Sequence, residues 1–182
     1  MNRREFVGYS ALATLVASAT DLKAAPTDKP SILLPESARV YDIGHGEGRI
    51  LVGAEQSGGA WWLGSFRNEP GRKTSLHVHR SMDEQFYGLD GNISIWVDGR
   101  WHDLPPGALA VVPQGTPHAL WNRTKQAVHF LNSGNPAGFE RLFADIETIL
   151  RQLSYGSPEF FAELVKAYKK YNTDMLGPAP PD

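Results

Sequence analysis

Between residues 49 and 132, short apolar runs alternate with turn residues, and this spacing constrains the fold more than any other feature of the sequence. Each run is four to seven residues long, which is typical of a strand rather than a helix. Asp98-Gly99 separates two of the runs and supplies the positive φ angles that a two-residue hairpin turn needs. The strands predicted in this way cover residues 49–54, 60–66, 76–79, 84–89, 92–97, 100–104, 108–112, 119–122 and 127–132. Such a series predicts an all-β barrel or sandwich.

After Gly134-Asn135-Pro136 the apolar period becomes helical. Large apolar residues recur at helical spacing from Phe139 to Leu153, and again from Phe160 to Tyr168. Ser157-Pro158 between them is a helix start, with serine as the cap and proline at the first helical position. We expect two amphipathic helices that pack on the outer barrel wall or in a dimer interface, in preference to a lid over the barrel mouth.

The N-terminus has the order of an export signal. Arg3-Arg4 precedes a mildly apolar run from Phe6 to Ala19, and small residues follow. This order is similar to a twin-arginine signal, and the run is too short and too weakly apolar to be a secure membrane span. We therefore expect a signal at 1–25, a linker at 26–35, a β-barrel at 36–135 and a helical extension at 136–182, with no stable membrane span once the signal is removed. The expected location is the periplasm.

Composition excludes two classes of function. The formal net charge is −2 and no basic patch is present, so the sequence does not predict binding to nucleic acid. There are no cysteines, which excludes disulfides, thiolate nucleophiles and thiolate metal sites. Any metal must be held by imidazole and carboxylate groups.

A candidate metal site follows from strand parity. His77 and His79 are two residues apart on a predicted strand, so both imidazoles point to the same side. Glu84 begins the next strand after a short turn, and His118 lies at the head of a later one. Three imidazoles and one carboxylate suit one divalent transition metal, namely Fe, Mn, Ni, Co, Cu or Zn, with one or two coordination positions left open. Nothing in the sequence marks the other three histidines as ligands; they are His45, His102 and His129.

The same parity predicts the surroundings of this site. The residues expected to face inward with the ligands are Ser75, Phe86, Gly88, Leu120, Asn122, one of Trp61 and Trp62, and Leu63 or Phe66 correspondingly. The cavity would then be mostly apolar and aromatic. It could hold a flat or apolar small molecule with one oxygen on the metal, or it could simply be the core of a small barrel.

Two motifs carry a family resemblance. The first is Gly71, five residues, His77, one, His79, four, Glu84, six, Gly91. It resembles the first conserved motif of the cupin superfamily, with every position filled at the family spacing.

The second motif is Gly107, five residues, Pro113, one, Gly115, two, His118, three, Asn122. It resembles the second cupin motif. The fifteen residues between the two motifs resemble the short spacer of small microbial cupins. The strand pattern extends the resemblance over about residues 35 to 135 and indicates a single barrel.

The resemblance implies a cupin (jelly-roll) β-barrel with a C-terminal pair of α-helices, in a protein that forms a homodimer. The family's metal ligands would be His77, His79, Glu84 and His118, and Asn122 would be structural. The small cupins that this chain resembles include quercetin 2,3-dioxygenase-like proteins, which implies a dioxygenase that acts on a phenolic or enolic small molecule, with Glu84 as the catalytic base. The alternatives are a non-redox metal cupin (an isomerase, decarboxylase, lyase or cyclase) and a non-catalytic periplasmic binder of a small molecule or metal.

Overall fold

The computed structural model describes residues 32–34 and 37–182. Eleven strands, a 3₁₀ turn and three α-helices are formed in this part of the chain. In chain order they are β1 (Val40–Asp42), β2 (Gly46–Val52), α1 (Ala54–Ser57), β3 (Trp62–Asn68), β4 (Leu76–His79), β5 (Asp83–Asp90), β6 (Ile93–Val97), β7 (Arg100–Leu104), β8 (Leu109–Val112), β9 (Ala119–Trp121), β10 (Val128–Asn135), η2 (Phe139–Arg141), α2 (Leu142–Leu150), α3 (Pro158–Lys170) and β11 (Thr173–Gly177). The signal predicted at 1–25 lies outside the described residues.

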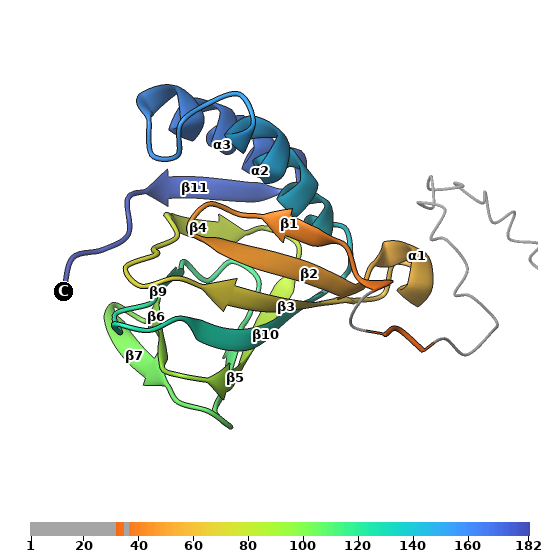
Figure 1. The fold of residues 1–182 in the computed structure, drawn as a ribbon, viewed down its shortest axis with the longest axis horizontal. Helices are drawn as coiled ribbons and strands as arrows, with labels where there is room; N and C mark the ends of the chain where they lie inside the picture. Colours follow the sequence, from red (N-terminus) through yellow and green to blue (C-terminus); the bar gives the residue numbers. More distant parts are fainter. Residues whose placement is uncertain (1–31, 35–36) are drawn as a thin grey trace, which may run out of the picture.

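The strands form a jelly-roll barrel of antiparallel sheets (Figure 1). One sheet has six strands in the order β1-β2-β3-β10-β5-β8, and a second has three in the order β7-β6-β9. A two-stranded sheet pairs β4 with β11, the last strand of the chain. The all-β prediction and the two C-terminal helices are confirmed.

Local sequence signals explain several elements. Asp98 and Gly99 have φ angles of 53° and 81°, as the two-residue turn between β6 and β7 requires. The side chain of Ser157 accepts a hydrogen bond from the Phe160 amide at 3.1 Å, so it caps α3 as predicted. Lys169 and Lys170 lie in the last turn of α3, where positive charge suits the helix dipole.

Strand boundaries differ from the sequence prediction at several ends. The strand predicted at 49–54 begins earlier, at Gly46, and Ala54 instead begins the short helix α1. The last barrel strand continues to Asn135, three residues beyond its predicted end. Strands β1 and β11 were not predicted, because each is short and depends on pairing with a partner strand.

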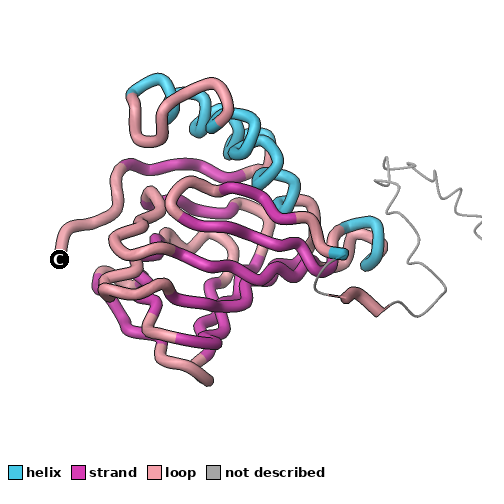
Figure 2. Tube along the Cα trace, viewed as in Figure 1, coloured by secondary structure: helices cyan, strands magenta, loops and turns pink. Residues whose placement is uncertain are grey.

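The helical extension lies beside the barrel and also returns a strand to it. In Figure 2 the cyan helices α2 and α3 run along one side of the magenta strands, next to β11. Helix α2 contacts β1 and α3, and α3 contacts β11. The segment after residue 136 is therefore two helices followed by a barrel strand. Among the described residues, no helix is long and apolar enough to cross a membrane.

Candidate metal centre

The barrel brings the four predicted ligands together. His77 and His79 are the second and fourth residues of β4, and Glu84 is the second residue of β5. His118 precedes β9 and is fixed against β4 by two backbone hydrogen bonds: the His77 amide donates to the His118 carbonyl at 3.0 Å, and the His118 amide donates to the His77 carbonyl at 2.9 Å. Pairing of β4 with this segment therefore sets the distance between two of the imidazoles.

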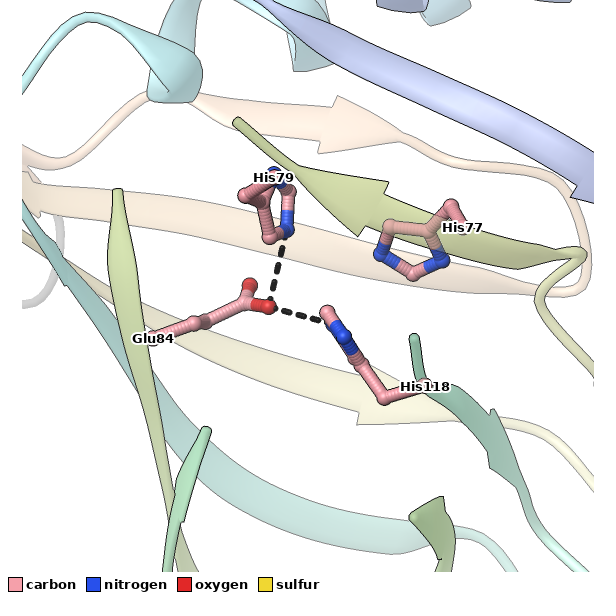
Figure 3. Close-up of side chains that lie close together, drawn as sticks. All are labelled: His77, His79, Glu84 and His118. Atoms are coloured by element: carbon pink, nitrogen blue, oxygen red, sulfur yellow. Dashed lines mark hydrogen bonds and ion pairs between the residues drawn. The ribbon is translucent and has the colours of Figure 1, made fainter. Parts of the chain in front are cut away.

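The four side chains form a compact, buried cluster (Figure 3). One donor atom from each lies within 4.8 Å of every other. Their exposed fractions are 5% for His77, 2% for His79, 3% for Glu84 and 0% for His118. Buried histidines and carboxylates at this spacing are typical of a metal site.

Backbone carbonyls orient two of the imidazoles. The Nδ1 atom of His77 lies 2.9 Å from the Ser75 carbonyl, and that of His118 lies 3.0 Å from the Thr116 carbonyl. A carbonyl only accepts hydrogen bonds, so Nδ1 carries the proton in both rings. The lone pair is then on Nε2, the atom that a metal would bind.

The third imidazole is oriented by the last strand of the chain. His79 Nδ1 lies 2.8 Å from the Thr173 hydroxyl oxygen, and this hydroxyl donates its own proton to the Tyr171 carbonyl at 3.1 Å. Since the hydroxyl proton is already used, the oxygen accepts from Nδ1–H. Thr173 is 1% exposed and fixes the same tautomer in His79 as the carbonyls fix in the other two rings.

Glu84 completes the cluster with its two oxygens in different roles. Oε2 lies 3.0 Å from His79 Nε2 and 2.8 Å from His118 Nε2. Oε1 accepts a hydrogen bond from Asn132 Nδ2 at 3.1 Å. Burial by itself would raise the pKa of Glu84, but the charges and hydrogen bonds of His79 and His118 hold this pKa well below its usual value.

The donor set fits a divalent cation. With Nδ1 protonated, the Nε2 atoms of His79 and His118 are acceptors that face the Glu84 carboxylate. Two acceptors in contact repel unless a proton or a cation lies between them. Burial, followed by repulsion from His118 and His79, holds the pKa of His77 well below its usual value, so this ring is neutral as a ligand must be. Burial lowers the pKa of His118, but its hydrogen bond to Glu84 outweighs burial and raises it.

A small aromatic cavity of about 60 Å³ adjoins His77 and Glu84. Its apolar walls include Phe66, Phe86, Leu120, Phe130, Phe139, Phe143, Ile146 and Tyr168. The last four of these come from η2, α2 and α3, so the C-terminal helices close the mouth of the barrel. This placement supports the lid alternative, while α2 also packs against β1 at the barrel edge. A role of these helices in a dimer interface stays a prediction.

Most inward positions predicted from parity are buried. Trp62 is fully buried and Trp61 is 45% exposed, so the second tryptophan and Phe66 face inward. Asn122 is buried and donates to the Asn68 and Gln126 carbonyls, which agrees with a structural role. Ser75 does not line the metal cavity, because β4 begins only at Leu76 and strand alternation does not extend back to it.

Three residues at the site were missed by the sequence reasoning. Asn132 could have been found, because it shares the inward parity of Phe130 on one strand. Thr173 and Arg72 gave no local signal: the first acts through a long-range strand pair, and the second lies just outside a strand. In the described part of the chain, the cluster of metal-ligating groups does not include His45, His102 or His129.

Comparisons with known proteins agree with this architecture. Residues 64–134 match the Cupin domain family. A stretch of 96 residues is 30% identical to quercetin 2,3-dioxygenase of Bacillus subtilis (strain 168), and it covers 47% of this chain and 28% of that protein. The match thus spans little more than a quarter of the length of this curated relative.

Two solved structures are similar in fold. KdgF from Halomonas sp. has a TM-score of 0.55 at 16% identity, with 60% of this chain and 96% of that chain covered. The polyketide cyclase RemF from Streptomyces resistomycificus has a TM-score of 0.53 at 19% identity, with coverages of 59% and 80%. The sheet order, the domain match and these likenesses support the cupin superfamily, and the fold of this chain is the cupin jelly roll.

Proposed function

We propose that this chain is a metal-dependent dioxygenase that acts on a phenolic or enolic small molecule. The observation that carries the proposal is the buried cluster of three imidazoles and one carboxylate, in which every Nε2 lone pair faces inward. The partial match to a quercetin 2,3-dioxygenase supports this reaction class over others.

A divalent metal held by His77, His79, Glu84 and His118 would polarise a bound enol or phenol oxygen and favour loss of its proton. We propose that Glu84 accepts this proton. Its Oε1 is held by Asn132, so the carboxylate stays positioned while Oε2 faces the site centre. We assign Glu84 the role of catalytic base.

The aromatic walls exclude water from this chemistry. Phe139 and Tyr168 both lie near the ligand rings. The ring centroids of Phe139 and His79 are 4.5 Å apart, and those of Tyr168 and His77 are 5.5 Å apart. The cavity of about 60 Å³ is smaller than the roughly 300–1,000 Å³ typical of sites for drug-sized molecules. The cavity is closed by η2, α2 and α3, which together form its helical roof. A bicyclic substrate therefore requires this roof to move outward.

Two measurements test the proposal. Elemental analysis should find metal in the purified protein and little or none after His77, His79 or His118 is replaced by alanine. An oxygen electrode should then record uptake when phenolic and enolic compounds are added to the loaded protein. Full metal occupancy in all three folded variants would refute the metal site.

The oxygen experiment also separates the alternatives. Transformation of a compound without oxygen uptake would indicate Lewis-acid chemistry, such as isomerisation, decarboxylation, elimination or cyclisation. Binding of a compound that is never transformed would indicate a non-catalytic binder. Either result would refute the dioxygenase.

We also propose that the protein is exported to the periplasm by the twin-arginine pathway and forms a homodimer. The proposal of export rests on the Arg3-Arg4 signal, which lies outside the described residues. Light scattering of the purified protein measures its oligomeric state, and a monomer mass would refute the homodimer.

A further inference from the structure

A second, larger hollow lies on the surface between α3 and β11. This groove has a volume of about 660 Å³, within the roughly 300–1,000 Å³ range of small-molecule sites. Its walls include three large apolar side chains that are nearly half exposed: Phe161 and Val165 of α3 and Leu176 of β11, at 43%, 46% and 48%. Exposed apolar side chains gathered in one concave surface are typical of a binding site.

The groove continues toward the metal through a smaller cavity of about 40 Å³. This inner cavity shares Lys73, Tyr155 and Phe161 with the groove. It shares Arg72 and Tyr168 with the metal cavity. The inner cavity therefore adjoins both the groove and the metal cavity. The three spaces together mark a route from the surface beside α3 toward the metal ligands.

Arg72 stands where this route reaches the metal cavity. Its Nε donates to Asn68 Oδ1 at 3.0 Å, and Tyr155 lines the same inner cavity. In the part of the chain that the structure describes, no acidic side chain forms an ion pair with Arg72, and Asp42 acts on it only through longer-range attraction. Arg72 is half-buried, and its guanidinium keeps its charge there. An anionic group brought in by a ligand would pair with this charge.

We infer that the groove and Arg72 form the access and binding site for a hydrophobic organic anion, an aromatic body with one carboxylate or phenolate oxygen. The apolar walls of α3 and β11 would hold the ring, and the Arg72 guanidinium would bind the anionic oxygen. The inference names the class of substrate for the proposed metal enzyme, and to that extent it rests on the proposed function. The binding site itself requires no metal chemistry.

The first test uses two probes with the same naphthalene ring, one anionic and one neutral. Binding of 2-naphthoate and of neutral 2-naphthalenemethanol is measured by titration calorimetry in the metal-free and the metal-loaded protein. We expect the naphthoate to bind about tenfold more tightly in both, which is the size of one hydrogen bond to a charged group. Arg72→Gln should remove this preference and Arg72→Lys should keep part of it. Equal binding of the two probes to the wild-type protein would overturn the inference.

The second test addresses the groove with a matched control. The double variant Val165→Asn with Leu176→Asn should weaken both probes by about tenfold, because it removes apolar contact on two walls. The control is Leu109→Asn with Val111→Asn on β8, one leucine and one valine at 60% and 58% exposure away from the groove. It should change binding less than about twofold. Equal effects of the two double variants would overturn the groove, even if Arg72→Gln fails to fold.

Failure of this inference and failure of the proposed function give different results. Arg72-dependent and groove-dependent binding without oxygen uptake by any compound would remove the dioxygenase and leave the anion site. Oxygen uptake with a neutral compound, together with no charge preference in the binding of the probes, would remove the anion site and leave the dioxygenase.

Discussion

Replacing Thr173 by valine tests whether the last strand of the chain controls the metal centre. Thr173 is 1% exposed, and its hydroxyl accepts the Nδ1 proton of His79 at 2.8 Å. Valine has nearly the same shape but no acceptor, so the packing is kept and one buried hydrogen bond is lost. A buried donor left without a partner costs about 1–3 kcal/mol.

Most of this cost should fall on metal binding rather than on folding. In the metal-free variant, His79 can move its proton from Nδ1 to Nε2, where Glu84 Oε2 at 3.0 Å accepts it. A metal needs the Nε2 lone pair, so metal binding would drive the proton back to the unpartnered Nδ1. Loss of a hydrogen-bond partner of a metal ligand typically costs about 10–100-fold in metal affinity, or about 1.4–2.7 kcal/mol. This range agrees with the cost of one unsatisfied buried donor.

The assay is competition for Zn²⁺ against a chelator at constant pH, with thermal unfolding of the metal-free protein as the measure of stability. Thr173→Ser keeps the hydroxyl and is the matched control, which should retain affinity within about threefold. Thr173→Val should lose about 10–100-fold. A folded valine variant with wild-type affinity would refute the argument that Thr173 fixes the tautomer of His79.

Three further predictions concern other parts of the chain. Glu84→Gln should keep a good part of its metal on three imidazoles but lose most turnover, as measured by metal content and oxygen uptake; loss of both in strict proportion would make Glu84 a ligand only. The pKa of His77 in the folded, metal-free protein lies well below 6.5, its ordinary value in the unfolded chain. At pH values between these two pKa values the unfolded chain binds more protons than the folded one, so the metal-free protein should lose stability as the pH falls below about 6.5. His77→Gln should flatten this slope in thermal unfolding from pH 7 to 5, and an unchanged slope would contradict the assignment. Replacing Arg3 and Arg4 by lysine should leave the protein in the cytoplasm of a bacterium that has the twin-arginine pathway, as fractionation would measure; unchanged export would contradict the signal.

The barrel could be predicted from sequence because its strands are defined locally. Short apolar runs between turn residues identified β2 to β10, and the Asp98-Gly99 pair identified one turn by its φ angles. Strand parity alone placed His77 and His79 on one side of β4, and the buried cluster agrees with this placement. Both signals depend on neighbours within a few residues.

The features that could not be predicted from the sequence are those that depend on contacts between distant segments. Thr173 pairs with His79 across 94 residues, and no local pattern marks a five-residue strand that follows a helix. The placement of α2 and α3 over the cavity was the less favoured alternative for a related reason. The apolar faces of α2 and α3 have the same period whether they cover a barrel wall, a dimer interface or a cavity, so the period could not select among these.

The cover over the cavity and the hydrogen bond that orients His79 both come from one segment. Tyr168, near the end of α3, contacts the His77 ring, and Thr173, at the start of β11, orients His79. Only Lys169 to Asn172 lie between them. The segment that closes the cavity is therefore also the one that orients a metal ligand, and a roof that opened by pulling away its end would disturb the metal centre.

The connection between α3 and β11 is anchored to the barrel, so the cavity could open without disturbing the metal centre. The Arg80 amide donates to the Asn172 carbonyl at 2.8 Å, and the Asp174 carboxylate forms ion pairs with Arg80 and Lys169. These contacts hold the C-terminal end of α3 and the start of β11 against the turn after β4. We expect an opening that keeps His79 oriented to pivot at this end and to move the N-terminal end of α3. The side chains displaced by such a movement are those around Tyr155, where the surface groove meets the inner cavity.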